Sequence, residues 1–146
     1  MLAGGEHVSG PAAHAYRQRV GAASREFAGR VLRTDRQARD LLGNPLLQIH
    51  HGEGMICVLN PATAACQLRG QVEDPMVTPD IDDCRPKCPN LARTDRDIEH
   101  VTAKAADLEQ IVADTLAPAL RHARDAHELA RLRTIIEGHQ HDEAAP

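Results

Sequence analysis

Two stretches decide the fold of this chain: CVLNPATAAC at residues 57–66 and CRPKC at residues 84–88. They contain all 4 cysteines of the 146-residue sequence, spaced Cys57-x8-Cys66-x17-Cys84-x3-Cys88. The segment around them is rich in Pro, Asp and Thr, so burial alone would not offset the entropy that is lost when it becomes ordered. We therefore predict that a ligand shared by the four sulfurs orders the middle of the chain.

A structural Zn²⁺ ion is the predicted ligand. Zinc binds four thiolates in a tetrahedron with Zn–S bonds of about 2.3 Å, and a full set of thiolates leaves no open position for catalysis. The spacing of Cys84 and Cys88 is close to that of paired zinc ligands, whereas Cys57 and Cys66 are farther apart than usual. The predicted metal ligands are Cys57, Cys66, Cys84 and Cys88.

Several alternatives to a four-thiolate zinc site stay open. Cys88-Pro89 is a frequent context for an iron–sulfur cluster, which would make the chain a redox sensor that regulates transcription. Two disulfides or unrelated buried thiols also agree with the number of cysteines. His50 and His51 lie shortly before Cys57, and either ring could replace a thiol ligand, although such a pair is more often polar turn surface.

The rest of the chain offers little material for a large core. Hydrophobic residues make up 42% of the sequence, but alanine supplies much of this share, and the aromatic residues are Tyr16 and Phe27. Burial contributes roughly 25 cal/mol per Å² of apolar surface, so such a chain often depends on a metal, a partner or a second copy of itself. We expect one domain, with a homodimer as one form of assembly.

Neither a membrane span nor a signal peptide is indicated by the sequence. The longest apolar run is Met55–Leu59, far short of the roughly 20 residues that a membrane helix needs. The start, MLAGGEHVSG, lacks the charged and apolar regions of a signal peptide. We therefore expect a cytoplasmic protein with no membrane contact, in a compartment where thiols stay reduced and four clustered cysteines favour metal.

Basic residues gather in the N-terminal third. Residues 11–44 contain seven Arg against three acids, a net charge of +4, although the whole chain has a net charge of −4. An arginine-rich helix face can contact the phosphates of DNA or RNA, and the alternative is a solvated face opposite an apolar stripe. The predicted nucleic-acid contacts are Arg17, Arg19, Arg25, Arg30 and Arg33.

Hydrophobic periodicity predicts a mainly α protein. It has a long N-terminal helix, a central four-cysteine metal-binding knuckle with a small β-hairpin, and a C-terminal antiparallel helical hairpin. The β-hairpin is expected from the runs 46–50 and 55–59, and residues 69–87 are expected to be loop. The predicted segments are a disordered lead-in at 1–11, a basic amphipathic helical arm at 12–45, the cysteine-rich metal-binding region at 46–92, a helical hairpin at 93–139 and a disordered tail at 140–146.

Local signals mark where the helices begin and end. Thr34 and Thr94 are predicted N-caps, the first within the capping box Thr34-Asp35-Arg36-Gln37. Gly43-Asn44-Pro45 predicts a helix stop, Pro118 breaks the C-terminal pattern, and Gly138 is expected to end the last helix. A heptad seam, typical of a coiled coil or a partner-binding helix, is formed by Ile98, Val101, Ala105, Leu108 and Val112.

The sequence contains no recognised catalytic set. A glycine-rich phosphate loop, His-Glu-x-x-His and Gly-x-Ser-x-Gly are all absent from it. The C-terminal histidines, including His100, His122 and His139, are expected on solvated helix surface. We therefore expect a protein that is not an enzyme.

The cysteine segment resembles a part of actinobacterial proteins that are found beside integrase or transposase genes of mobile elements. The resemblance depends on Asn60-Pro61-Ala62 between the first two cysteines, on Asn90-Leu91-Ala92-Arg93-Thr94-Asp95 after Cys88, and on Arg36-Gln37-Ala38-Arg39 with Asn44-Pro45 before them. It covers about residues 13–139, and in those relatives the segment lies near the C-terminus of a longer protein, so this chain is expected to be a shortened copy. The resemblance implies a DNA-transaction setting but supplies no catalytic residue.

These observations together predict a non-enzymatic, zinc-stabilised accessory protein of a mobile element. It would bind DNA or a recombinase during integration, recombination or transposition. The Arg, His and Tyr set of tyrosine recombinases has no match here, because the single tyrosine, Tyr16, lies on the apolar face of the predicted helix. The alternatives are the iron–sulfur regulator and a helical protein–protein adaptor that uses the heptad seam.

Overall fold

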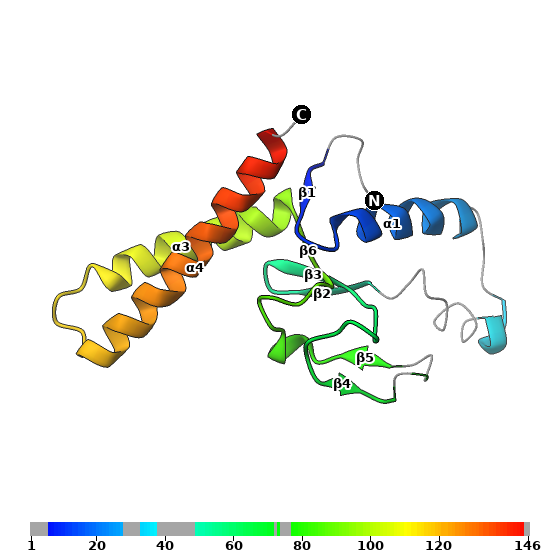
Figure 1. Ribbon diagram of the computed structural model, residues 1–146, viewed down its shortest axis with the longest axis horizontal. Helices are drawn as coiled ribbons and strands as arrows, with labels where there is room; N and C mark the ends of the chain where they lie inside the picture. The colour runs from blue at the N-terminus through cyan, green and yellow to red at the C-terminus, as the bar shows by residue number, and fades with distance from the viewer. Residues whose placement is uncertain (1–5, 28–32, 38–48, 72, 74–76, 145–146) are drawn as a thin grey trace.

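A four-stranded antiparallel sheet lies at the centre of the molecule (Figure 1). The computed structural model describes residues 6–27, 33–37, 49–71, 73 and 77–144. The strand order is β1-β6-β3-β2, and a second sheet consists of β4 and β5 alone. The strands are β1 (Val8–Ser9), β2 (Ile49–Gly52), β3 (Met55–Val58), β4 (Leu68–Arg69), β5 (Thr78–Pro79) and β6 (Leu91–Thr94).

The protein is therefore α+β, and the prediction of a mainly α fold is wrong. The hairpin expected near residues 46–59 is present as β2 and β3, but it is only half of the central sheet. β1 lies in the segment 1–11 that was expected to be disordered, and β5 lies in the expected loop at 69–87. Both strands have two residues, too few to show alternation in a sequence, so only their distant partners make them strands.

Strand β6 is hydrogen-bonded along both edges. Ala92 lies opposite Ile56 of β3, and Thr94 lies opposite Val8 of β1. Successive residues of a strand point to opposite faces, so Ala92 and Leu91 face different sides of the sheet. Both are buried, with exposed fractions of 0% and 1%, so each face of the sheet is covered.

Helix α1 (Ala13–Phe27) covers the first of these faces. Gly10 allows the chain to turn from β1 into the helix, because its φ is +98° and a Cβ there would lie 2.9 Å from the Leu91 carbonyl oxygen. Tyr16 is buried, in agreement with its predicted place on the apolar stripe. The buried cluster under the helix contains Val8, Ala12, Tyr16, Ile56, Val58 and Ala92.

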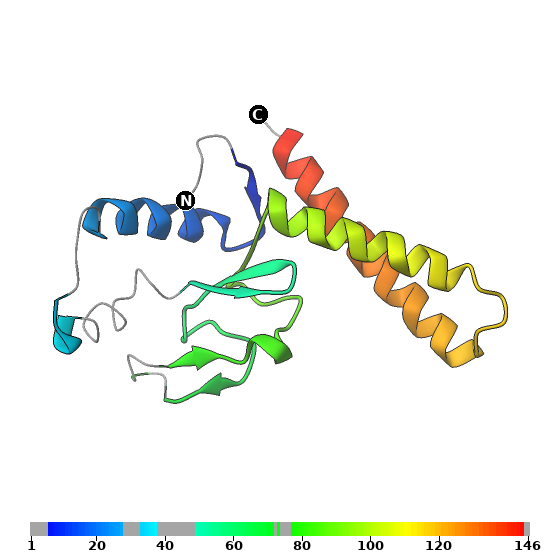
Figure 2. The same cartoon turned by 180° about the vertical axis from the view of Figure 1, so that it is seen from behind.

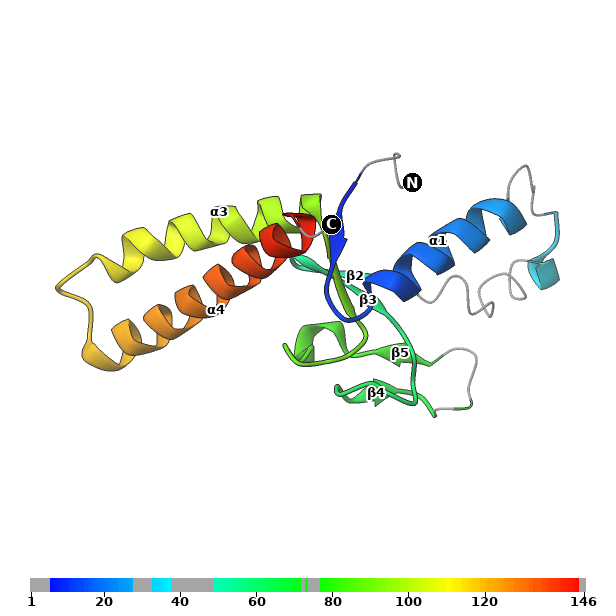
Figure 3. The same cartoon turned by 45° about the horizontal axis from the view of Figure 1, so that its top comes forward.

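Helices α3 (Asp95–Val112) and α4 (Ala119–Ala144), which we call the helix pair, run side by side away from the sheet (Figure 3). They and α1 extend from opposite ends of the sheet (Figure 2). The predicted cap at Thr94 is confirmed, since its side chain accepts from the Asp97 N–H in a full capping box. The seam buries Val101 and Ala105 against Leu129 and Leu132.

The last helix is longer than expected. The predicted end at Gly138 is wrong, because α4 continues to Ala144 and so includes most of the segment 140–146 that was expected to be disordered. Glycine in a helix costs about 1 kcal/mol relative to alanine, and His139, the next residue, is only 4% exposed. Packing of that ring against the sheet offsets the weak helix propensity.

Part of the predicted N-terminal arm lies outside the described residues, namely 28–32 and 38–48, which include the predicted stop at Gly43-Asn44-Pro45. The predicted cap at Thr34 is observed, with the Gln37 N–H donating to Thr34 Oγ1 over 3.2 Å. Among the described residues, no helix has the length and apolar character to cross a membrane.

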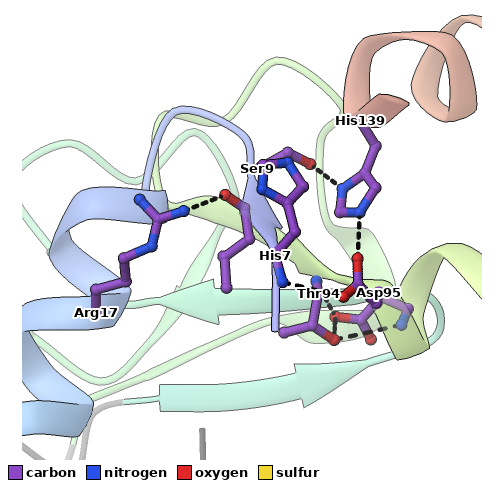
Figure 4. A network of polar contacts seen from close by, with 8 residues as sticks. His7, Ser9, Arg17, Thr94, Asp95 and His139 are labelled. Carbon is purple, nitrogen blue, oxygen red and sulfur yellow. Dashed lines mark hydrogen bonds and ion pairs between the residues drawn. The ribbon is translucent and has the colours of Figure 1, made fainter. Parts of the chain in front are cut away.

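A hydrogen-bond network joins the two ends of the chain (Figure 4). His139 Nε2 lies 2.9 Å from Asp95 Oδ1, and His139 Nδ1 lies 2.6 Å from Ser9 Oγ. Because the carboxylate can only accept, Nε2 carries the proton, and in a neutral ring Nδ1 accepts from the hydroxyl of Ser9. The backbone N–H of His7 donates to Asp95 Oδ2 over 3.0 Å. The network ties β1 to both helices of the pair.

The burial of His139 corrects its expected place on solvated surface. Serine, histidine and aspartate in a hydrogen-bonded row are also the groups of hydrolytic triads. Here Ser9 is 7% exposed and His139 is 4% exposed, so the row lies within the fold, where it joins β1 to the helix pair. Hydrogen bonds from His139 and from the His7 backbone hold the pKa of Asp95 below its ordinary value. The stability that these bonds add is therefore present above the ordinary pKa and is lost as the pH falls through the lowered one.

We predict that His139→Ala lowers the free energy of unfolding by about 1–3 kcal/mol, because it removes two hydrogen bonds and leaves the buried Ser9 hydroxyl without its partner. Urea unfolding followed by circular dichroism measures the change. His141→Ala is the control, since His141 is exposed on the same helix, and we expect its effect to stay within about 0.5 kcal/mol. Equal losses in the two variants would contradict a specific role for the network.

Candidate metal centre

Cys57 lies on the face of the sheet opposite α1. It is paired with Leu91 of β6, and its neighbours Ile56 and Val58 both point to the α1 side. On its own face Cys57 packs with Leu59 and Val77. The segment 59–90 between β3 and β6, which we call the knuckle, contributes Leu59, Val77, Leu68 and Ile81 to this face from among its described residues. Cys57 therefore points toward the segment that contains the other three cysteines.

Short backbone pairings bring the remaining cysteines of the knuckle together. Cys66 precedes β4, and the pairing of β4 with β5 is extended by an Asp80 N–H donated to the Gln67 carbonyl over 3.2 Å. Asp80 leads into the 3₁₀ turn η2 (Ile81–Asp83), which Cys84 ends. Cys88 closes the next turn, with its N–H donated to the Arg85 carbonyl over 3.0 Å, and β6 starts three residues later.

Asn60 and Asn90 link the two halves of the cysteine motif. The side-chain amide of Asn90 donates to the Asn60 carbonyl over 3.0 Å, and Asn90 Oδ1 accepts from the Thr63 hydroxyl over 2.8 Å. Asn90 is buried, so these bonds satisfy polar atoms that would otherwise destabilise the fold. At Asn60-Pro61 the chain makes a hydrogen-bonded turn, in which the Ala62 N–H donates to Asn60 Oδ1 over 3.2 Å.

The four sulfurs, which we call the thiol cluster, act on one another electrostatically. Burial raises the pKa of the Cys57 thiol to about 12, and the thiolate charges of Cys84, Cys88 and Cys66 add to the rise. Burial also raises the pKa of Cys84, with further contributions from Cys88 and Cys66. Charges perturb one another in this way only over short distances. All four cysteines are free thiols, and Cys57 and Cys88 are buried.

The thiol cluster does not have the geometry of a finished metal site. Among the described residues, no group of three or more His, Cys, Asp or Glu side chains is arranged to hold a metal ion. The cluster fits zinc in donor type and number, since four sulfurs suit a tetrahedral ion. A bound cation would also stabilise the thiolate form of Cys57, which burial disfavours. For the four sulfurs to surround an ion, the cysteine side chains would have to rotate.

Two arginines act electrostatically on the thiol cluster, and sequence patterns identified neither of them. Arg19 lowers the pKa of Cys57, and Arg93 lowers the pKa of Cys84, each against the effect of burial. Both arginines are half-buried. Four thiolates around Zn²⁺ carry a net charge of −2, so two nearby cations would compensate it. Arg93 follows Leu91 by two residues in β6, so both side chains point to the same face of the sheet. From the sequence, Arg93 could have been placed on this face only after residues 91–94 were assigned to a strand.

A cleft of about 390 Å³ opens between the knuckle and the helix pair. Cys84 lies in its wall, together with Arg93 and with Arg131 of α4. Arg131 is held by Glu128 through two hydrogen bonds of 2.7 and 2.8 Å, whereas Arg93 Nε is buried without a partner. The cleft gives one face of the thiol cluster a path to solvent, by which an ion could enter.

The two histidines that were considered as ligands differ in position. His50 lies opposite Cys57 in the pairing of β2 with β3, so the two side chains share the knuckle face. His51 is exposed on the other face. Burial is the main cause that lowers the pKa of His50, followed by the charges of His51 and Arg19.

The predicted nucleic-acid face is partly engaged within the fold. The Arg17 guanidinium donates to the Val8 carbonyl over 2.9 Å and so holds β1 against α1. Arg19 is half-buried beside Cys57, whereas Arg25 and Arg33 are exposed. Arg30 lies outside the described residues. Of the four predicted arginines that the structure describes, Arg17 and Arg19 are thus engaged within the fold, and Arg25 and Arg33 are exposed.

Comparison of the chain with protein-family profiles, with curated proteins and with solved structures gives no match.

Proposed function

We propose that the chain is a non-enzymatic accessory protein that is organised by a structural four-thiolate zinc centre and binds a recombinase. The supporting observation for the zinc centre is that Cys57 on the sheet faces three cysteines of the knuckle. A full set of four thiolates would leave no open coordination position, so the ion would hold the fold and not react. We place the protein in the cytoplasm, where thiols stay reduced.

The tip of the helix pair is the proposed partner-binding surface. Leu116 and Leu120 are 91% and 89% exposed, and Ile111 beside them is 40% exposed. A groove of about 590 Å³ is lined by Ile111 and Leu116, together with Ala117 and Pro118. Single exposed apolar residues are ordinary, but a contiguous group of them is typical of an interaction site.

Two hydrogen bonds stabilise the turn between α3 and α4, which contains Leu116. Asp114 Oδ1 accepts from the Leu116 N–H over 2.9 Å, and His122 Nε2 lies 3.0 Å from the Val112 carbonyl oxygen at the end of α3. A preorganised surface loses less entropy when it binds a partner. The choice of a recombinase as partner comes from the resemblance to mobile-element proteins, and a second copy of the chain is the alternative occupant.

The metal content of the purified protein tests the first half of the proposal. We expect one Zn²⁺ per chain by elemental analysis, loss of the ion in Cys84→Ser, and unfolding of the knuckle on chelation, because structural zinc contributes on the order of 10 kcal/mol. Arg85→Ser is the matched control, since Arg85 is the exposed neighbour of Cys84. A brown, iron-containing sample would favour the iron–sulfur regulator instead, and a metal-free wild-type protein would reject both.

Substitutions at the tip test the second half. We expect Leu116→Glu with Leu120→Glu to weaken binding to a recombinase at least tenfold, about 1.4 kcal/mol, without lowering the melting temperature. The measurement is biolayer interferometry against purified tyrosine recombinases, serine recombinases and transposases. Thr102→Glu is the control, since Thr102 is exposed on α3 away from the tip. Absence of binding to every enzyme, or equal binding by all variants, would contradict the proposal, and sedimentation equilibrium would then test self-association.

Duplex DNA is a second candidate partner, favoured by the exposure of Arg25 and Arg33 near the end of the N-terminal arm. Interleaved aromatic residues for stacking are lacking in this arginine-rich sequence, which disfavours single strands. Binding would then use phosphate contacts without reading bases.

We predict that any DNA affinity falls steeply with salt, because each phosphate contact adds roughly 0.9 to the slope of log K against log salt concentration. Arg25→Ala with Arg33→Ala would reduce this slope by about 2. Gel-shift titrations over a salt series measure it, with Arg96→Ala, an exposed residue of α3, as the control. No binding at low salt would remove DNA from the proposal.

A further inference from the structure

His50 faces the thiol cluster from the edge strand β2. It is directly opposite Cys57 in an antiparallel pair, and such residues point to the same face with Cβ atoms about 4.5–5.5 Å apart. The neighbouring pair confirms the alternation, because Ile49 and Val58 both pack on the α1 side. The imidazole of His50 is therefore within reach of the Cys57 sulfur.

The ring of His50 has a polar atom that is not satisfied. Its Nε2 is buried and has no hydrogen-bond partner among the residues that the structure describes. Nearly all buried polar atoms in folded proteins are hydrogen-bonded, so an exception calls for a specific explanation. A partner that becomes an acceptor only when a ligand binds is one such explanation.

The Cys57 sulfur, as a buried thiolate, would need a hydrogen-bond donor. Its side chain is 3% exposed and packs against Leu59 and Val77, so water does not reach it. A metal-bound thiolate in apolar surroundings depends on hydrogen bonds from residues behind it. A buried ring nitrogen without a described partner thus lies near a sulfur that, as a thiolate, would need a hydrogen-bond donor.

We propose that His50 donates a hydrogen bond from Nε2 to the Cys57 thiolate when the metal centre forms. This inference rests on the proposed zinc centre, because a neutral thiol is only a weak acceptor. His50 is then a positioning residue: it orients the sulfur toward the ion and disperses part of the negative charge of the four thiolates. Nδ1 is the unprotonated nitrogen of the neutral ring.

The test compares full-length wild-type protein with His50→Leu, which removes the donor, and with His50→Gln, which keeps one. His51→Leu is the matched control, because His51 is the next residue and is exposed on the opposite face. Zinc affinity is measured by competition with a chromophoric chelator. The absorption spectrum of the Co²⁺-loaded proteins reports how many thiolates bind the ion, and circular dichroism checks folding, with His50→Ala as a second donor-free variant.

We expect His50→Leu to bind zinc about 10–100-fold more weakly than the wild type, the usual effect of removing such a supporting group. His50→Gln should recover part of this loss, and His51→Leu should match the wild type. The Co²⁺ spectra of all variants should keep the same four-thiolate charge-transfer band, because His50 is not itself a ligand.

Two results would overturn the inference and leave the metal centre in place. One is equal zinc affinity of the wild type and His50→Leu. The other is a wild-type Co²⁺ spectrum with three thiolates and a nitrogen that changes in His50→Leu, because His50 would then bind the ion directly. A wild-type protein without any thiolate charge-transfer band would overturn the zinc centre itself, and this inference with it.

Discussion

Hydrogen bonding along both edges of β6 is the constraint on which the other elements depend. Four residues, Leu91–Thr94, pair with β3 and β1 and continue directly into the capping box of α3. Because a helix that begins at the last residue of a strand cannot change its direction freely, the pairing of β6 also orients the helix pair. The same strand follows Cys88 by three residues, so it sets where the knuckle ends.

The two faces of the sheet are stabilised by different means. Under α1 the cluster is apolar and contains Tyr16, Ile56 and Val58. The knuckle face has only a small cluster with Leu59 and Val77, and its turns are joined by the polar bonds of Asn90. A segment with so little apolar burial needs another source of order. Four thiols that gather on this face, with two arginines beside them, would supply it once a cation binds.

Buried polar groups have mostly structural roles in this protein. The row Ser9–His139–Asp95 contains the groups of a hydrolytic triad, but its burial makes it a tie between β1 and the ends of the helix pair. Arg17 is used in a similar way, since its guanidinium holds the Val8 carbonyl. The exposed leucines at the tip of the helix pair are the contrast, because no contact within the described residues covers them. Contacts in the interior thus account for the fold, and the tip of the helix pair is the proposed partner-binding surface.

Sequence alone determined the features whose signals span a few residues. The caps at Thr34 and Thr94 depend on hydrogen bonds within one helical turn. The seam at Val101 and Ala105 follows from the spacing of apolar residues, and the break before α4 follows from Pro118. Tertiary structure decided the sheet, because a two-residue strand such as β1 exists only through its pairing with Thr94, more than 80 residues away. It also decided which side chains are buried. No local pattern distinguishes His139 from its exposed neighbour His141, or brings Cys57 to the same face as His50.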